Sequence, residues 1–397
     1  MKLGAPDRVR QSRRALRPRH LVLLFALVLG SCAPAPAASP AAPAPATTGP
    51  VAQPAATAAQ PAATAAQPET PPAAQAPPPL NPPVSLKVGS LRLVGEAGLM
   101  AALGKGYFRE EGLDVDLVPF RTTNEQTAPL ATGELQLGSV GPDPSLFNAM
   151  QRGIELKIVG YNAIISDHDT SGGFLVRQDL LDSGAYKEFK DLKGTTLPVS
   201  LLGGLGQVWI ERVLAKGNLT LDDVTLTTIT FPDMPAAFAN KAIDAAFMVE
   251  PFVTVAEAQG TAKNVLPSGQ IYPGLVAMVL LMSPVFAREQ PEAAQRFVTA
   301  YLRGQRDYYR AFVQDQGGKE EIFQYLQQYT PVADPHLLPR MTTHIVDPNG
   351  VMDPRTLNEL QDAFVRYGTQ QQKVDLGRVI DGAYAERAVQ RLGRAAP

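Results

Sequence analysis

Four acidic side chains stand where predicted strands give way to helices, and these residues could do chemistry with a small ligand. They are Glu96, Asp143, Asp233 and Glu250. In open α/β sheets, ligands bind beyond the carboxyl ends of the strands, which is where such corners lie. The loops at these corners contain no Lys or Arg, whereas a free anion usually needs Arg or a dense set of N–H donors. The corners therefore favour a ligand with amine or ring N–H groups, or a neutral heterocycle such as a pyrimidine or flavin.

Each acid also has a purely structural interpretation. Glu96 follows Gly95 and could be a solvated acid at a helix start. Asp143 and Asp233 each precede a predicted helix and could act as N-caps. Glu250 could bond a backbone N–H near a hinge. Asn162, at the end of another predicted strand, could offer its amide to a polar ligand.

A glycine-rich corner precedes the predicted helix that carries Trp209. The run from Leu201 to Gln207 contains Gly203, Gly204 and Gly206. Three glycines before a helix could cradle an oxygen-rich group on backbone N–H donors. The alternative is a tight strand-to-helix turn. The pattern is not a dinucleotide fingerprint, because G-x-G-x-x-G is absent.

Short apolar strands alternating with helices must position these corners. The stretch from Leu86 to Phe120 contains strand, loop, helix and strand, which is a βαβ unit and predicts a parallel sheet. The predicted strands are Leu86–Leu93, Asp114–Pro119, Leu135–Ser139, Leu156–Tyr161, Gly173–Arg177, Thr195–Ser200, Val224–Thr230, Ala245–Val249 and Val276–Met282. The predicted helices between them are Glu125–Ala131, Pro144–Gln151, Gln207–Lys216, Met234–Asn240 and Val253–Gln259. After Ser283 the pattern becomes helical, at Pro291–Val313, Lys319–Gln328, Pro335–His344 and Pro354–Tyr367.

The N-terminal region predicts export and lipid anchoring. Residues 1–31 have a basic head and an apolar run, Leu21–Leu29, which is too short to span a bilayer. Cys32 is the only cysteine, and its position after small residues resembles a bacterial lipobox. That resemblance implies cleavage before Cys32 and lipidation of its sulfur. An ordinary signal peptide is the alternative. Residues 32–84 are rich in Pro and Ala and predict a disordered tether.

Charge argues against nucleic acid as a partner. Without residues 1–31 the chain keeps 29 Lys and Arg against 37 Asp and Glu, a net charge of about −8. An acidic protein lacks the phosphate-neutralising surface that nucleic-acid binding requires.

Four motifs occur in a fixed order along the chain. They are GYFREEGLDV at 106–115, LATGELQLG at 130–138, DLKGT at 191–195, and FANKAIDAAF at 238–247 followed by EPF. With these motifs the sequence resembles the solute-binding proteins of ABC importers in the nitrate, sulfonate and taurine group. That group includes binders of thiamine-pyrimidine precursors and riboflavin.

The resemblance implies an α/β, two-lobed periplasmic-binding-protein fold of the second type, with two crossover hinge strands and a helical C-terminal segment on the first lobe. The first lobe would comprise residues 85–173 and 277–397, and the second lobe residues 174–276. By resemblance, Gly141 and Pro142 line the cleft and the loop at Gly203–Gln207 is the main ligand loop of the second lobe. The complete predicted ligand-binding set is Gly95, Glu96, Gly141, Pro142, Asp143, Asn162, Gly203, Gly204, Leu205, Gly206, Gln207, Asp233 and Glu250.

The function expected from the sequence is that of an extracytoplasmic, lipid-anchored receptor that delivers a sulfonate, pyrimidine, flavin or similar small molecule to an ABC permease. A ligand-binding sensor lipoprotein is an alternative. A pyrimidine-synthase-like cleft enzyme is another, although the cysteine-rich motif of that enzyme is absent. We expect no enzymatic activity and no cofactor. We also expect no metal, because the four histidines lack metal-ligand spacing.

Overall fold

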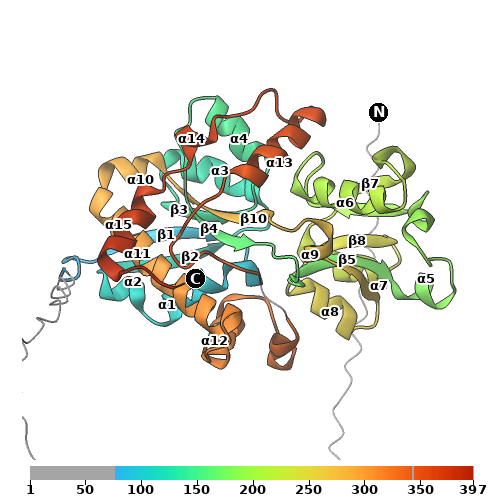
Figure 1. Cartoon of the computed structure of the whole chain (residues 1–397), viewed down its shortest axis with the longest axis horizontal. Helices are drawn as coiled ribbons and strands as arrows, with labels where there is room; N and C mark the ends of the chain where they lie inside the picture. Colours follow the sequence, from blue (N-terminus) through green and yellow to red (C-terminus); the bar gives the residue numbers. More distant parts are fainter. Residues whose placement is uncertain (1–76, 342–343, 397) are drawn as a thin grey trace, which may run out of the picture. The chain divides into compact units, whose positions relative to one another are not determined.

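A mixed five-stranded sheet forms the core of the first lobe (Figure 1). The computed structural model describes residues 77–341 and 344–396. The strand order is β2-β1-β3-β10-β4, with β1 parallel to both β2 and β3, and β10 antiparallel to β3 and β4. The strands are β1 Val84–Ser90, β2 Leu113–Pro119, β3 Leu137–Val140, β4 Lys157–Ile164 and β10 Val276–Met282. The helices between them are α1 Ala97–Gly104, α2 Tyr107–Glu110, α3 Thr123–Thr132 and α4 Pro144–Gln151.

The second lobe contains a three-stranded sheet, β8-β5-β9, and a parallel pair, β6 and β7. A backbone bond from Asp244 N–H to the Thr196 carbonyl connects the two. The strands are β5 Gly172–Arg177, β6 Thr196–Val199, β7 Thr225–Thr228, β8 Ala245–Val249 and β9 Ala262–Pro267. The helices are α5 Gln178–Asp182, α6 Leu205–Lys216, α7 Met234–Ala239, α8 Phe252–Ala258 and α9 Ser268–Ile271.

Two segments carry the chain between the lobes. The first runs from β4 to β5 and the second from β9 to β10. This arrangement is the two-lobed α/β fold that the sequence predicted. All the described residues belong to one compact unit, Pro71–Pro397.

Helices fill the C-terminal part of the chain, as predicted. They are α10 Pro284–Glu289, α11 Pro291–Tyr308, α12 Lys319–Tyr329, α13 Arg355–Arg366, α14 Leu376–Val379 and α15 Ala383–Leu392. The long helix α11 packs closely on α1 because glycines face each other there. A Cβ added to Gly304 would lie 2.2 Å from the Gly98 carbonyl oxygen. Helices α11 and α15 also contact the sheet of the first lobe, whereas α12 packs on α1 and α13 packs on α4.

Helix α13 also reaches the second lobe. Arg366 and Tyr367 donate hydrogen bonds to Glu211 of α6, at 2.7 and 2.5 Å. The Thr369 hydroxyl donates to the Gly203 carbonyl at 2.8 Å. We call this region, residues 355–369 with its contacts to α6, the α13 strap. The 3₁₀ turn η6, Pro335–Arg340, contacts α8 of the same lobe.

The structure differs from the sequence predictions at several elements. The helix predicted at Pro335–His344 is the short 3₁₀ turn η6, because Pro339 interrupts helical hydrogen bonding. The strand β9 and the helices α2, α5, α9, α10, α14 and α15 were not predicted. Residues at the end of the predicted tether contact the body: Leu80 N–H bonds the Glu111 carbonyl, and Arg296 bonds the Pro78 carbonyl. The predicted signal peptide, Cys32 and most of the tether lie outside the described residues.

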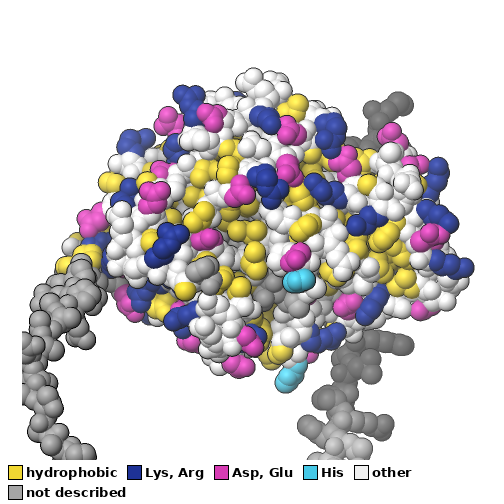
Figure 2. Space-filling model, viewed as in Figure 1, with side chains coloured by type: hydrophobic (Ala, Val, Ile, Leu, Met, Phe, Trp, Pro, Cys, Tyr) yellow, Lys and Arg dark blue, Asp and Glu magenta, His cyan; other side chains and the backbone are white. Residues whose placement is uncertain are grey.

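Charged side chains of both signs are interspersed over the face shown in Figure 2. Ion pairs elsewhere in the structure include Arg355–Glu359 within α13, and Lys373, beyond the end of α13, with Asp362 on that helix. No helix within residues 77–341 and 344–396 is long and apolar enough to cross a membrane.

Candidate ligand-binding site

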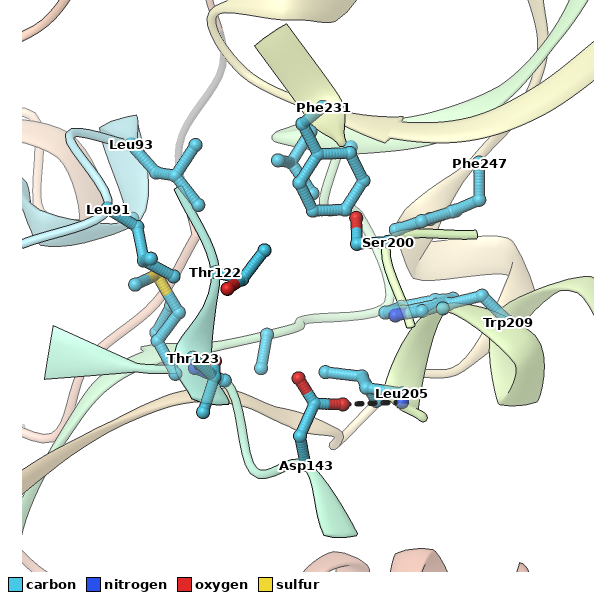
Figure 3. A pocket seen from close by; sticks show the side chains of 18 of the residues that line it. Leu91, Leu93, Thr122, Thr123, Asp143, Ser200, Leu205, Trp209, Phe231 and Phe247 are labelled. Carbon is cyan, nitrogen blue, oxygen red and sulfur yellow. Dashed lines mark hydrogen bonds between the residues drawn. The ribbon is translucent and has the colours of Figure 1, made fainter. Parts of the chain in front are cut away.

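A cavity lies between the two lobes, with walls from both (Figure 3). Its volume is about 120 Å³. A site for one water needs only ~10–15 Å³, so this cavity can hold a small organic molecule. The first lobe contributes Leu91, Leu93, Gly95, Arg121, Thr122, Thr123, Asn124, Gly141, Asp143, Ala163, Ala277 and Met278. The second lobe and the crossing segments contribute Ile165, Ser171, Gly172, Ser200, Leu201, Leu205, Gly206, Trp209, Phe231, Phe247, Val249, Glu250 and Ser268.

Aromatic rings form the wall of the second lobe. Trp209 of α6 stacks on Phe247 of β8 with ring centroids 4.2 Å apart and planes 8° from parallel. Figure 3 shows these rings and Phe231 on one side of the cavity and Leu91 and Leu93 on the other. Such a space suits a flat or apolar molecule, since apolar pockets with a few placed polar groups are the usual ligand sites.

Asp143 connects the lobes at the floor of the cavity. Its Oδ1 accepts a hydrogen bond from the Leu205 backbone N–H, 2.8 Å away at the start of α6. Burial raises the pKa of the Asp143 carboxyl to about 6, although its bonds from Leu205 and Thr123 oppose the shift. The prediction that Asp143 caps its own helix is wrong: it makes no side-chain bond to α4, because the carboxylate turns across the cleft.

Glu250 is the second carboxyl in the cavity wall and is 3% exposed. Its oxygens accept from the Thr254 hydroxyl at 2.7 Å and the Thr254 N–H at 3.1 Å. Burial raises the pKa of Glu250 to about 7. The backbone N–H that it bonds therefore belongs to α8, not to a hinge segment.

Arg121 closes the rim of the cavity from the first lobe. Its guanidinium bonds Asp233 and donates to the Thr230 hydroxyl at 2.9 Å, both on the second lobe. Arg121 was not among the predicted residues, because the loop between β2 and α3 was not one of the corners considered. The signal was available: Arg121 lies in a strand-to-helix loop, two residues after β2 ends and two before α3 begins.

The cavity brings together six of the predicted residues: Gly95, Gly141, Asp143, Leu205, Gly206 and Glu250. Seven others lie outside its lining: Glu96, Pro142, Asn162, Gly203, Gly204, Gln207 and Asp233. Asp233 makes no side-chain cap for α7, because its carboxylate accepts from Thr230 and Arg121.

Glu96 points into its own loop and not into the cavity. It is 1% exposed and accepts from the Ser90 hydroxyl at 2.8 Å and from the backbone N–H groups of Leu91 and Leu93 at 3.2 and 3.0 Å. Burial raises the pKa of this carboxyl. Glu96 therefore holds the β1–α1 loop together, and the ligand preference that we drew from its charge loses that support.

The side chains of Asn162 and Gln207 are also engaged within the protein. The Asn162 amide donates to the Ser139 hydroxyl at 2.6 Å and accepts from the Tyr301 hydroxyl at 2.7 Å. The Gln207 side chain accepts from Gly203 N–H at 2.8 Å, so it orders the glycine loop before α6. These residues support the cavity wall from behind.

Two hydroxyl groups in the cavity wall have no hydrogen-bond partner. They are Thr122 Oγ1 and Ser200 Oγ, both buried. Figure 3 shows Thr122 and Ser200 on opposite sides of the cavity, Thr122 on the first lobe and Ser200 on the second. Buried hydroxyls are normally bonded, so these two are candidate contacts for a polar edge of a ligand. No cluster of His, Cys, Asp and Glu that could hold a metal occurs among the residues that the structure describes.

Comparison with known proteins agrees with this geometry. The family model described as NMT1/THI5 like matches residues 95–311. A Brucella abortus protein named only as a binding protein is 27% identical over 196 residues, which are 49% of this chain and 57% of that protein. The chain thus spans less than two thirds of the length of the first relatives it matches.

Other relatives carry more specific names. A Bacillus subtilis protein named for the binding of aliphatic sulfonates is 24% identical over 308 residues, covering 74% of this chain and 85% of that protein. An Aspergillus parasiticus protein named as a 4-amino-5-hydroxymethyl-2-methylpyrimidine phosphate synthase is 25% identical over 225 residues, 52% of this chain and 61% of that protein. Among solved structures, the alkanesulfonate-binding protein of Xanthomonas axonopodis pv. citri bound to MOPS has a TM-score of 0.60, with 20% identity, covering 76% of this chain and 99% of that one.

Proposed function

Because the chain belongs to the NMT1/THI5-like family, we propose that it is the solute-binding component of an ABC importer, which captures a small organic molecule between its lobes. The observation that carries the proposal is the cavity between the two sheets, with one wall on each lobe. A ligand that contacts both walls at once binds the closed arrangement better than an open one, and so shifts the population towards closure.

The contacts across the cleft fit such a closing motion. Asp143 bonds Leu205, and Arg121 bonds Asp233 and Thr230, each pair joining one lobe to the other. These bonds are polar and can break when the lobes separate, as can the bonds of the α13 strap to Glu211 and Gly203. We further propose that the protein acts outside the cytoplasm, anchored by a lipid on Cys32, and that it delivers its ligand to a permease.

Ligand capture is tested with the single tryptophan of the chain, Trp209, which stands in the cavity wall. The purified full-length protein is titrated with nitrate, alkanesulfonates, pyrimidines, flavins and amino acids while its fluorescence and melting temperature are recorded. We expect one class to raise the melting temperature and to change the Trp209 emission at the same ligand concentration. A Trp209→Phe variant controls for signal from the ligand itself. If no class changes either quantity, the proposed function is wrong.

Lipid anchoring has a separate test. Metabolic labelling with a radioactive fatty acid should mark the wild-type chain and leave a Cys32→Ser variant unlabelled. Equal labelling of both would contradict anchoring at Cys32, and it would leave the ligand-binding proposal standing.

A further inference from the structure

The first turn of α6 faces the cavity, with Leu205, Gly206 and Trp209 in its wall. The first N–H groups of a helix have no partner inside the helix and carry the positive end of its dipole. Such a helix end commonly receives an anionic group of a ligand. The N–H groups in the first turn of α6 therefore need hydrogen-bond acceptors, either from a ligand or from the protein itself.

A carboxylate of the chain itself already occupies this position. Asp143 Oδ1 accepts from Leu205 N–H at 2.8 Å, and Gly204 leaves room for it, since a Cβ there would lie 2.7 Å from the same oxygen. Neighbouring N–H groups are also engaged: Gly203 donates to the Gln207 side chain, and Gln207 donates to the Gly204 carbonyl. At this helix end, the N–H of Leu205 is thus bonded from across the cleft, and those of Gly203 and Gln207 are bonded within the loop.

The charges around the cavity act in the same direction. Glu250 places a second carboxyl in the wall. Among the described residues that line the cavity, Arg121 is the only Lys or Arg, and its guanidinium is paired with Asp233. An incoming anion would meet the Asp143 carboxylate at the helix end and no uncommitted cation, and like charges in a shared enclosed site repel strongly.

The rest of the cavity wall describes the body of the ligand that fits. Aromatic rings of Trp209, Phe247 and Phe231 face aliphatic side chains of the first lobe, which favours a flat apolar body. The unpartnered hydroxyls of Thr122 and Ser200 can donate to or accept from a polar edge. Among the described residues that line the cavity, none offers an unpaired cation to a negatively charged ligand.

We propose that Asp143 is an anion-excluding specificity residue: by occupying the N-terminus of α6, it restricts the cavity to uncharged or cationic molecules with a flat apolar body. The inference rests on the proposed ligand-capturing function and names the ligand class of that same cavity. It also separates this chain from relatives named for sulfonate binding.

Three probes of similar size and different charge test the proposal: benzamidine as the cation, benzamide as the uncharged molecule and benzenesulfonate as the anion. Each is titrated into the full-length protein, with binding followed by calorimetry and Trp209 fluorescence. We expect benzamidine or benzamide to bind the wild-type protein at least tenfold more tightly than benzenesulfonate. In Asp143→Gly, which empties the helix end, benzenesulfonate should bind at least tenfold more tightly than it does to wild type.

A second variant covers the case in which Asp143→Gly does not fold. Asp143→Asn keeps an oxygen acceptor for Leu205 N–H and removes only the charge, so benzenesulfonate binding should improve by a smaller, severalfold factor. Asp222→Asn, at an exposed acid of the second lobe, is the matched control and should leave the preference among the probes unchanged.

Two results would overturn the proposal. One is wild-type protein that binds benzenesulfonate as tightly as benzamidine and benzamide. The other is no gain of benzenesulfonate binding in either Asp143 variant, whether or not the wild-type protein binds a compound from the broad screen. If the screen described under Proposed function finds a ligand, either result leaves the ligand-capturing function standing. Failure of this inference is therefore distinguishable from failure of the proposed function.

Discussion

The buried Glu250 should make the stability of the protein depend on pH, and Glu250→Gln should remove that dependence. Burial raises the pKa of this carboxyl from 4.5 to about 7 in the folded protein, with a further contribution from the nearby Glu257 and an opposing one from Arg340. Between these two pH values the folded state holds a proton that the unfolded state has released. The free energy of unfolding therefore falls as pH rises through this window, because the unfolded state binds fewer protons there.

The size of the effect follows from the two pKa values. A shift from 4.5 to about 7, at ~1.4 kcal/mol for each pH unit, corresponds to roughly 3.5 kcal/mol. About 2.5 kcal/mol of this loss should fall between pH 5 and pH 8. Gln at this position has no charge at any pH, and its amide can still accept from Thr254 N–H and donate to the Thr254 hydroxyl.

The assay compares the unfolding free energies of wild type and Glu250→Gln in guanidinium chloride at pH 5 and pH 8. We expect the difference between the two proteins to move in favour of the variant by about 2–3 kcal/mol on going from pH 5 to pH 8. The exposed Glu289→Gln controls for the loss of one acidic side chain. A difference between wild type and Glu250→Gln that is the same at both pH values would refute the reasoning.

Three further substitutions test individual contacts. Phe364→Ala, at a fully buried ring of α13, should lower the free energy of unfolding in urea by ~3–5 kcal/mol. The neighbouring Val365 is 38% exposed, so Val365→Ala should change this free energy by no more than ~0.5 kcal/mol. Equal effects of the two substitutions would contradict the packing described. Arg121→Ala should lower the free energy of unfolding by at most ~1 kcal/mol, because the ion pair with Asp233 is about half exposed. It should nevertheless speed amide hydrogen exchange in the loop at Thr230. Unchanged exchange would show that the pair does not hold the lobes together. Glu96→Ala should lower the free energy of unfolding by more than ~2 kcal/mol, because Ser90, Leu91 and Leu93 lose the buried acceptor of their hydrogen bonds. An unchanged free energy of unfolding would make Glu96 a possible ligand contact again.

Much of the fold could be predicted because its strands are short and apolar. All nine predicted strand segments overlap strands of the structure, although their ends differ by a few residues. The strand β9 was missed because Ala262–Pro267 includes Lys263 and Asn264 and lies at the edge of its sheet, where burial leaves a weaker pattern. Helix α15 was also missed, although its sequence is amphipathic, with a buried face at Tyr384, Ala385 and Ala388, so this signal was available.

The site was less predictable, because the order of strands and helices along the sequence does not fix the direction of each side chain. Glu96 and Glu250 both follow a strand, yet Glu250 lines the cavity and Glu96 closes its own loop. Asp143 has the sequence context of an N-cap, and only the position of α6 explains why its carboxylate turns away from α4. For Asp143 the outcome depends on a contact between residues 62 positions apart, whereas Glu96 and Glu250 bond residues at most six positions away.

The α13 strap has a consequence for protein engineering. The second lobe is a continuous piece of chain, from β5 to β9, so a designer would be tempted to excise it or exchange it with that of a relative. Its helix α6, however, is covered by Ala363 and Arg366 of α13, from more than 100 residues downstream. An excised second lobe would expose Val208 and its neighbours to water. A second lobe grafted from a relative would have to contact an α13 strap of a different sequence. A chimera that exchanges ligand preference between relatives should therefore move residues 172–267 together with residues 355–369.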